Sequence, residues 1–165
     1  MNYHNITHDD MLNGQGLRVV LWVAGCNHHC QECQNPETHN PNGGIPFDEM
    51  AEKELTSYLK KPYIEGITFS GGDPLYPLNR ETVTKLAKKI KEEFPDKNIW
   101  LYTGYLYEEV KDLEIINYLD VMVDGEFIKA LNDNNLHWKG SSNQRVIDIP
   151  KTLQLDRVIL LEEKE

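Results

Sequence analysis

The chain has 165 residues, a formal net charge of -10 and three cysteines. This length favours a single folded domain over residues 1–165. The negative charge argues against direct binding to nucleic acid, because such binding depends on Lys and Arg that neutralise phosphates. The residues ahead of position 18 are mostly polar, and the longest apolar run (19–25) is far shorter than the roughly 20 residues of a membrane span. We therefore expect no signal peptide, no membrane association and a reducing, cytoplasmic environment.

Strand and helix patterns alternate along the chain. Residues 18–24 (RVVLWVA) form a continuous apolar run, which is typical of a buried parallel strand. Apolar residues at helical spacing predict a helix over 47–61, with Asp48 as its cap, and a second helix over 79–94. Residues 66–70 (GITFS) predict a strand between these helices. The remaining expected elements are a strand at 98–104, a helix at 106–119, a strand at 120–125 and two candidate strands at 144–149 and 156–161.

Strands joined by helices of this length predict an α/β fold with mostly parallel strands and right-handed crossovers. Four or five such units are too few for a closed eight-unit barrel, which takes about 250 residues. An open, partial (β/α) barrel or a doubly wound sheet fits the pattern. In both folds the functional site lies at the carboxyl ends of the strands. The motifs that follow the expected strands are the cysteine loop from Cys26, SGGDP (70–74), TGY (103–105) and VDGEF (123–127).

The segment GCNHHCQECQN (25–35) contains all of the cysteines of the chain. They are Cys26, Cys30 and Cys33, spaced C-x3-C-x2-C. Thiolates at such close spacing favour zinc or an iron–sulfur cluster. A zinc site would need a fourth ligand, which His28, His29 or His39 could supply. A cubane cluster on three thiolates would instead keep one iron without a protein ligand, and a substrate or cofactor could bind there, as it does at the open position of catalytic metal sites.

This spacing, placed after the first strand of a partial barrel, resembles the radical S-adenosylmethionine superfamily. The resemblance implies a partial (β/α) barrel of that superfamily's type and a [4Fe-4S] cluster on Cys26, Cys30 and Cys33. It also implies that the amino and carboxylate groups of S-adenosylmethionine chelate the open iron. An electron from the reduced cluster then cleaves the sulfonium, and the resulting 5'-deoxyadenosyl radical abstracts a hydrogen atom.

An ordered set of short motifs is similar to one family within that superfamily, the anaerobic ribonucleoside-triphosphate reductase activating proteins. The motifs are NGQGLR (13–18), SGGDP (70–74), YTGY (102–105), VDGEF (123–127) and KGSSNQR (139–145). The similarity spans roughly residues 1–149 and leaves the last sixteen residues peripheral. It implies that the partner is the anaerobic ribonucleoside-triphosphate reductase, which receives a glycyl radical, and that a one-electron donor such as flavodoxin or another reductant serves the cluster.

The resemblance also implies which residues lie beside the cofactor. Gly71, Gly72 and Asp73 would lie at its methionyl end, where glycines let backbone groups approach a ligand closely. Glu32, Cys33 and Gln34 would also be cofactor-binding positions. The chain departs from the family pattern at four positions. They are Glu32, where the superfamily often has an aromatic residue, Gln34 in place of Tyr, Gln15 in place of Pro and Lys139 in place of Arg.

Other motifs have weaker functional readings. The stretch GSSNQR (140–145) could bind the cofactor or order a loop, and Asp124 could act in the site or in a turn. Trp22 and Trp100 are expected in the core. His28 and His29 are expected as loop residues near the cluster. Hydrogen abstraction by a cofactor radical needs no protein acid or base, so we assign no catalytic side chain.

Three alternatives stay open on the sequence. An activase of a formate-lyase-type glycyl radical enzyme would use the same cluster chemistry. A zinc-structured interaction module would use the cysteines only to hold a loop. An electron-transfer protein would normally have four cysteine ligands, and this chain has three.

Overall fold

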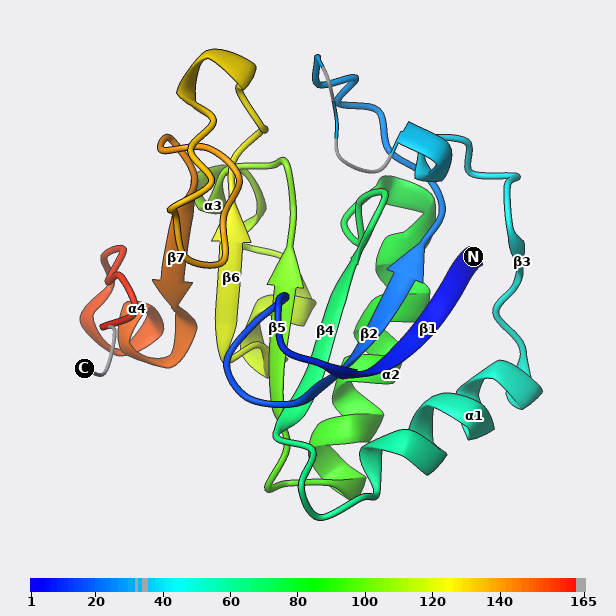
Figure 1. The fold of residues 1–165 in the computed structure, drawn as a ribbon. Coiled ribbons are helices and arrows are strands. Elements are labelled where there is room, and N and C mark those ends of the chain that lie inside the picture. Colours follow the sequence, from blue (N-terminus) through cyan, green and yellow to red (C-terminus); the bar gives the residue numbers. More distant parts are fainter. Residues whose placement is uncertain (32, 34–35, 163–165) are drawn as a thin grey trace.

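The computed structural model describes residues 1–31, 33 and 36–162 (Figure 1). These residues form a mixed α/β structure around an open seven-stranded sheet with the order β3-β1-β2-β4-β5-β6-β7. The strands are β1 (Asn2–Asp10), β2 (Arg18–Val23), β3 (Ile45–Pro46), β4 (Gly66–Gly71), β5 (Asn98–Tyr102), β6 (Val121–Asp124) and β7 (Arg145–Asp148). The α-helices are α1 (Glu49–Leu59), α2 (Arg80–Glu93), α3 (Tyr107–Val110) and α4 (Ile149–Leu155). Within the described part of the chain, no helix combines the length and the hydrophobicity that crossing a membrane requires.

The four central strands β2, β4, β5 and β6 run parallel, as the sequence predicts. Each of the long apolar runs forms one of them, and α1 and α2 make two of the connections. The edges differ from the expectation, because β1 and β7 pair antiparallel with β2 and β6. Strand β1 is absent from the sequence prediction. Its residues are mostly polar and only Tyr3 and Ile6 are buried, which is typical of a strand near a sheet edge.

Two predicted elements are wrong. The helix expected over 106–119 is broken into α3 and a 3₁₀ helix at Glu114–Tyr118. Val110, Ile115 and Ile116 are all buried, and the break between α3 and the 3₁₀ helix lets all three side chains join the main core. Instead of the strand expected over 156–161, the segment after α4 forms a turn and an isolated antiparallel bridge between Ile147 and Leu160.

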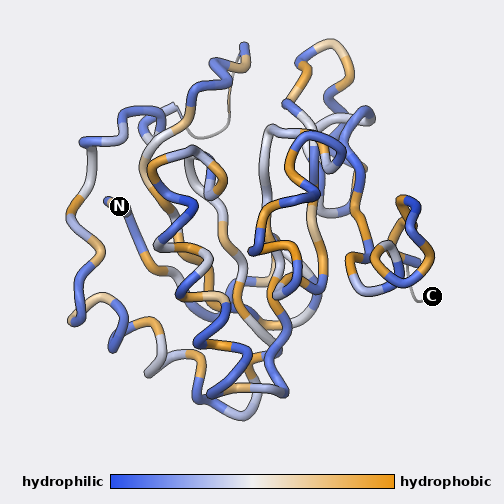
Figure 2. Tube along the Cα trace, turned by 180° about the vertical axis from the view of Figure 1, so that it is seen from behind, coloured by the Kyte–Doolittle hydropathy of each residue, from blue (hydrophilic) through white to orange (hydrophobic). Residues whose placement is uncertain are grey.

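The two faces of the sheet have different roles. On each central strand, every second side chain points to the same face of the sheet. Those of Leu21, Phe69 and Leu101 pack with α1 and α2 in the main core. Hydrophobic and hydrophilic residues alternate along these helices, as expected for helices with one buried side (Figure 2). The opposite face carries a smaller cluster of Trp100, Val121 and Val123. This second face is the one that the functional loops border.

Arg18 is a fully buried cation on that second face. Its guanidinium donates to Thr68 Oγ1 and the Ile67 carbonyl, each at 2.8 Å, and to the Gln15 carbonyl at 2.9 Å. Burial lowers its pKa to about 10. These bonds tie β2 and β4 to the segment between β1 and β2, which crosses in front of β4 and β5 (Figure 1). Through these bonds the NGQGLR motif is held against the sheet, and its first residue, Asn13, lines the cavity at the ends of the central strands.

Candidate functional site

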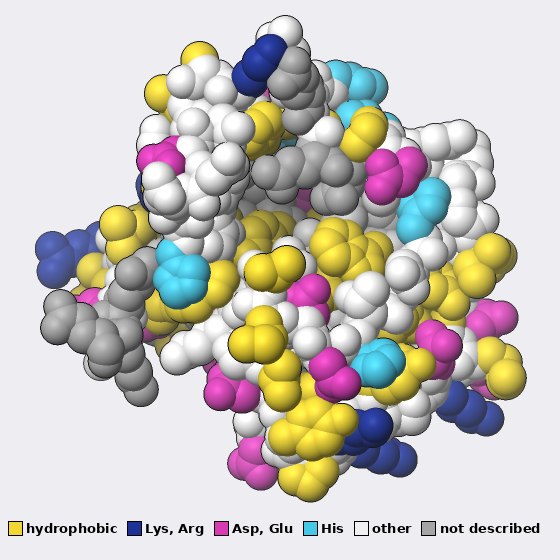
Figure 3. Space-filling model, viewed as in Figure 1, with side chains coloured by type: hydrophobic (Ala, Val, Ile, Leu, Met, Phe, Trp, Pro, Cys, Tyr) yellow, Lys and Arg dark blue, Asp and Glu magenta, His cyan; other side chains and the backbone are white. Residues whose placement is uncertain are grey.

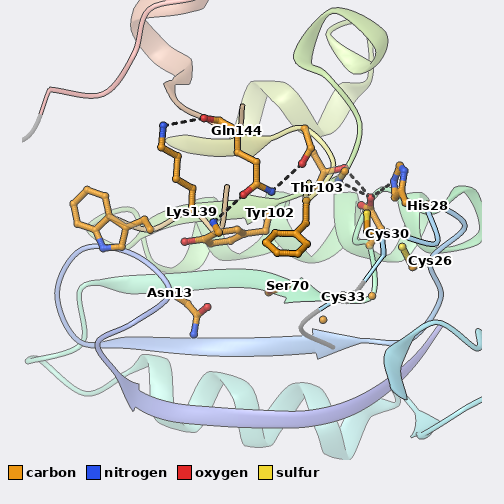
Figure 4. Close-up of a pocket in the computed structure, with 18 of the residues that line it drawn as sticks. Asn13, Cys26, His28, Cys30, Cys33, Ser70, Tyr102, Thr103, Lys139 and Gln144 are labelled. Atoms are coloured by element: carbon orange, nitrogen blue, oxygen red, sulfur yellow. Dashed lines mark hydrogen bonds and ion pairs between the residues drawn. The ribbon is translucent and has the colours of Figure 1, made fainter. Parts of the chain in front are cut away.

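The loops that follow β2, β4, β5 and β6 meet at one edge of the sheet and line a cavity of about 420 Å³. This confirms the prediction that the four motif loops share one rim. Figure 3 shows hydrophobic side chains gathered in the hollow of this face. In the close-up, Cys26, Cys30 and His28 lie at one end of the cavity and Lys139 lies at the other (Figure 4).

All three cysteines line this cavity, and each is partly exposed. The start of their loop is held by backbone hydrogen bonds from Gly25 N to Thr38 O (2.7 Å) and from Cys26 N to His39 O (3.1 Å). Burial raises the pKa of Cys26 to about 11 and also raises the pKa of Cys30. Without a metal these two thiols are therefore protonated near neutral pH, and metal binding would release their protons.

The cavity offers three thiols as metal ligands. Among residues 1–31, 33 and 36–162, no three Cys, His, Asp or Glu side chains are already gathered around one metal position. Three soft thiols on one wall of an open cavity nevertheless suit an iron–sulfur cluster better than a closed zinc site, which needs a fourth ligand. Of the histidines considered for that ligand, His28 has both ring nitrogens within hydrogen-bond distance of carboxylates. The residues present thus fit a cluster with an open side.

Asp73 was expected beside the methionyl end of a cofactor. The structure places Asp73 on the cavity, but its carboxylate is hydrogen-bonded to other residues of the protein. Only 1% of Asp73 is exposed. Its Oδ2 lies 2.6 Å from His28 Nε2 and accepts from Thr103 Oγ1 and Gly104 N, each at 2.9 Å. Its Oδ1 accepts from Leu75 N at 2.8 Å. The pKa of His28 is raised, and its hydrogen bond to Asp73 is the largest cause.

Gly71 and Gly72 also line the cavity. Gly71 has a φ of +107°, and a Cβ there would lie 2.4 Å from Val23 N. A Cβ at Gly72 would lie 2.5 Å from Gly25 O. The amides of Gly72 and Asp73 donate to Val23 O (2.8 Å) and Gly25 O (2.7 Å). The glycine pair is thus required for close packing of the β4 end against the start of the cysteine loop.

The KGSSNQR segment forms the wall at the other end of the cavity. Gln144 Oε1 accepts from Gly140 N (2.8 Å) and Ser141 N (3.1 Å), while Gln144 Nε2 donates to Gly125 O (3.0 Å). Lys139 Nζ donates to the Gln144 carbonyl at 3.0 Å (Figure 4). Gln144 therefore ties this segment to the loop after β6. Of the two readings that the sequence left open, the structure supports loop ordering directly.

Asp124 has a structural role. It is fully buried and binds Arg145 through both carboxylate oxygens, with Arg145 Nη2 at 2.5 Å and Arg145 Nε at 3.1 Å. It also accepts from Tyr107 N at 2.8 Å. Arg145 extends the network to Glu108 and lowers the pKa of that carboxyl. This network fixes the β6–β7 pair and the start of α3.

Several cavity residues were not identified from the sequence. Trp22 was expected in the core, but it is half-buried and lines the cavity, whereas Trp100 is in the core as predicted. Trp138 also lines the cavity, with an unusual φ of +64° for a bulky residue. Buried Asn79 donates to Ala24 O at 2.8 Å and to Asp73 O at 3.2 Å. Asn79 directly precedes α2, but its side chain does not cap that helix, so its place in the sequence would have predicted a different bond. The expected cofactor positions Glu32 and Gln34 lie outside the described residues.

Comparison with known proteins adds a family to this geometry. Residues 12–147 match the family model described as a 4Fe-4S single cluster domain. The chain is 49% identical over 146 residues to the anaerobic ribonucleoside-triphosphate reductase-activating protein of Enterobacteria phage T4, covering 88% of this chain and 93% of that protein. It is 41% identical to the proteins of the same name from Haemophilus influenzae (87% of this chain, 96% of that protein) and Escherichia coli K12 (88% and 97%).

Proposed function

Because the chain belongs to the family of anaerobic ribonucleoside-triphosphate reductase-activating proteins, we propose that it is a radical S-adenosylmethionine enzyme that generates a glycyl radical on that reductase. The activating reaction is an oxidoreductase reaction on a protein substrate. The observation that carries the proposal is the placement of three thiols, and no fourth in the chain, on the wall of one cavity in a chain that matches a 4Fe-4S domain.

In this proposal Cys26, Cys30 and Cys33 hold a [4Fe-4S] cluster with one open iron. When bound, the cluster supplies the electron that cleaves S-adenosylmethionine, and the radical formed from the cofactor takes a hydrogen atom from a glycine Cα of the reductase. The protein's own contribution is to bind, orient and exclude water. The cysteine wall fixes one end of the cavity, and the wall held by Gln144 fixes the other.

The turn at Gly71 and Gly72 is proposed to contact the methionyl end. Since the amides of Gly72 and Asp73 already donate to backbone carbonyls, this contact is assigned to the carbonyl side of the turn, which suits an ammonium group. Glu32 and Gln34 remain proposed cofactor neighbours from the resemblance alone. The open sheet is proposed to be a partial barrel of the radical S-adenosylmethionine type, and a flavodoxin-like donor and a cytoplasmic setting complete the proposal.

The alternatives have less support. The relatives described above are named for the ribonucleotide reductase, which disfavours a formate-lyase-type partner. A zinc-structured module would need a histidine ligand. Both ring nitrogens of His28 already face carboxylates, but Nε2 of His39 is buried without a hydrogen-bond partner among the described residues, so the match to a 4Fe-4S domain is what disfavours zinc.

Anaerobic reconstitution with iron and sulfide, followed by reduction and EPR with and without S-adenosylmethionine, tests the proposal. We expect a reduced [4Fe-4S] signal that changes when S-adenosylmethionine is added. A protein that takes up zinc but no cluster, or a cluster signal that ignores S-adenosylmethionine, would refute it.

A further inference from the structure

We propose that His28, held by Asp73 and seated against Gly104, is a positioning residue that fixes the cysteine loop at the edge of the cavity. The inference rests on the proposed function, because the loop that His28 positions is the one assigned to the cluster. It gives a physical reason for three motif residues that the radical chemistry itself does not use. They are the histidine between the first two cysteines, the acid of SGGDP and the glycine of YTGY.

The first support is the geometry of Asp73. Its carboxylate is buried and receives hydrogen bonds from the loop after β5 through Thr103 and Gly104. The same oxygen, Oδ2, lies 2.6 Å from His28 Nε2, although the two residues are 45 positions apart in sequence. One carboxylate oxygen therefore joins the cysteine loop, the loop after β4 and the loop after β5.

The second support is the enclosure of the His28 ring. The His28 side chain is only 9% exposed. Its Nδ1 lies 3.1 Å from Glu126 Oε1, from the loop after β6, and Tyr105 packs edge-on with ring centroids 4.6 Å apart. With both nitrogens engaged and the Tyr105 ring packed against it, the His28 ring is held in one orientation, unlike its exposed neighbour His29.

The third support is Gly104. A Cβ at this position would lie 2.6 Å from His28 Cδ2 and 2.8 Å from His28 Nε2. The φ of Gly104 is not in the left-handed region, so backbone conformation does not demand glycine there. Glycine is needed at position 104 because the His28 ring occupies the space that a side chain would take.

The consequence concerns the thiols. His28 lies midway between Cys26 and Cys30, so fixing its ring restricts the directions in which both thiols can point. Groups that orient metal ligands without touching the metal commonly change metal affinity by roughly 10- to 100-fold. We therefore expect loss of the His28 contact to weaken cluster retention while the sheet remains folded.

Four single variants test this. His28→Ala removes the ring, Gly104→Ala displaces it, and His28→Gln keeps an N–H that can reach Asp73. His29→Ala is the matched control, because it removes an exposed histidine of the same loop. Two quantities are measured on each full-length protein. One is amide hydrogen exchange of residues 26–31 without iron, and the other is the rate of iron loss to a chelator after anaerobic reconstitution.

We expect exchange and iron loss to rise by about tenfold in His28→Ala and Gly104→Ala, to stay near wild type in His29→Ala, and to recover partly in His28→Gln. Equal behaviour of His28→Ala and His29→Ala would overturn the inference. Exchange and iron loss that are as fast in His28→Gln as in His28→Ala would also overturn it. That result would mean that the loss of the ring destabilises the loop in general and that the bond to Asp73 plays no part. Hydrogen exchange in the iron-free protein tests the positioning role independently of the cluster. Failure of the wild-type protein to bind a cluster would refute the proposed function but not the positioning role.

Discussion

At the scale of single residues, the three cysteines differ from the other cavity residues in having no substitute in the chain. The sequence holds no further thiol that could replace one of them. Each cysteine should therefore be necessary for the cluster, whereas the aromatic and amide residues of the cavity should affect the cofactor more than the iron.

The first prediction concerns Cys33. Cys33→Ser should abolish stable [4Fe-4S] formation, because a neutral hydroxyl is a far poorer ligand for iron than a thiolate. Iron and sulfide analysis after anaerobic reconstitution checks this. Retention of a full cluster by Cys33→Ser would show that the third ligand comes from elsewhere.

The second prediction concerns Gln144. Gln144→Ala removes the acceptor for Gly140 N and Ser141 N and the donor to Gly125 O, so the far wall of the cavity should loosen. Each such bond is worth about 1 kcal/mol, so we expect S-adenosylmethionine binding to weaken by about tenfold or more with iron content unchanged. Equilibrium binding to the reconstituted protein measures this.

Gln154→Ala is the control for that experiment, since Gln154 is an exposed glutamine on α4. Unchanged binding in Gln144→Ala would mean that the wall held by Gln144 does not contact the cofactor.

The residues of the site could be predicted only in part. The cysteine spacing is local and indicates a metal centre directly. The bond between His28 and Asp73 joins residues 45 positions apart, and nothing in a single sequence pairs them. The resemblance predicts Asp73 as a cofactor neighbour, and the structure adds that its carboxylate is engaged by other residues of the protein.

At the scale of elements, apolar runs and a capping residue predicted the central strands and the start of α1 correctly. Strands β2, β4, β5 and β6 follow from their apolar runs, and Asp48 caps α1 as predicted, accepting from Ala51 N at 3.0 Å. Strand β1 was missed because its polar pattern does not show the buried run of a central strand. The prediction of one helix over 106–119 was wrong because its buried apolar residues belong to two short elements, α3 and the 3₁₀ helix at Glu114–Tyr118.

The third prediction belongs to this scale. Asp48→Ala should lower the free energy of unfolding by about 1 kcal/mol, because the α1 N-terminus loses its side-chain acceptor. Urea denaturation of the iron-free protein measures the change. Asp96→Ala, in the exposed turn after α2, is the control. Equal stability of the two variants would contradict the capping role.

At the scale of the whole molecule, the site and the core are separate. The main core packs α1 and α2 against one face of the sheet, while the cysteine loop lies at the carboxyl ends of the strands. None of the three cysteines belongs to the buried core described for this chain. The fold should therefore not depend on the cluster.

The fourth prediction follows. Removing iron should leave the helix and strand content by circular dichroism unchanged and cooperative unfolding intact. Hydrogen exchange should rise near residues 26–31 and stay slow in β4 and β5. Collapse of the circular dichroism signal on iron removal would show instead that the cluster is required for folding, as metals are in small zinc domains.

The central claim is that this protein transfers a hydrogen atom from a glycine of the reductase to the cofactor. The most direct measurement incubates the reduced, reconstituted protein with S-adenosylmethionine and anaerobic ribonucleoside-triphosphate reductase labelled with deuterium at the glycine Cα. The account predicts a glycyl radical by EPR and deuterium in the 5'-deoxyadenosine detected by mass spectrometry. Cofactor cleavage without deuterium transfer, or no radical on the reductase, would contradict it.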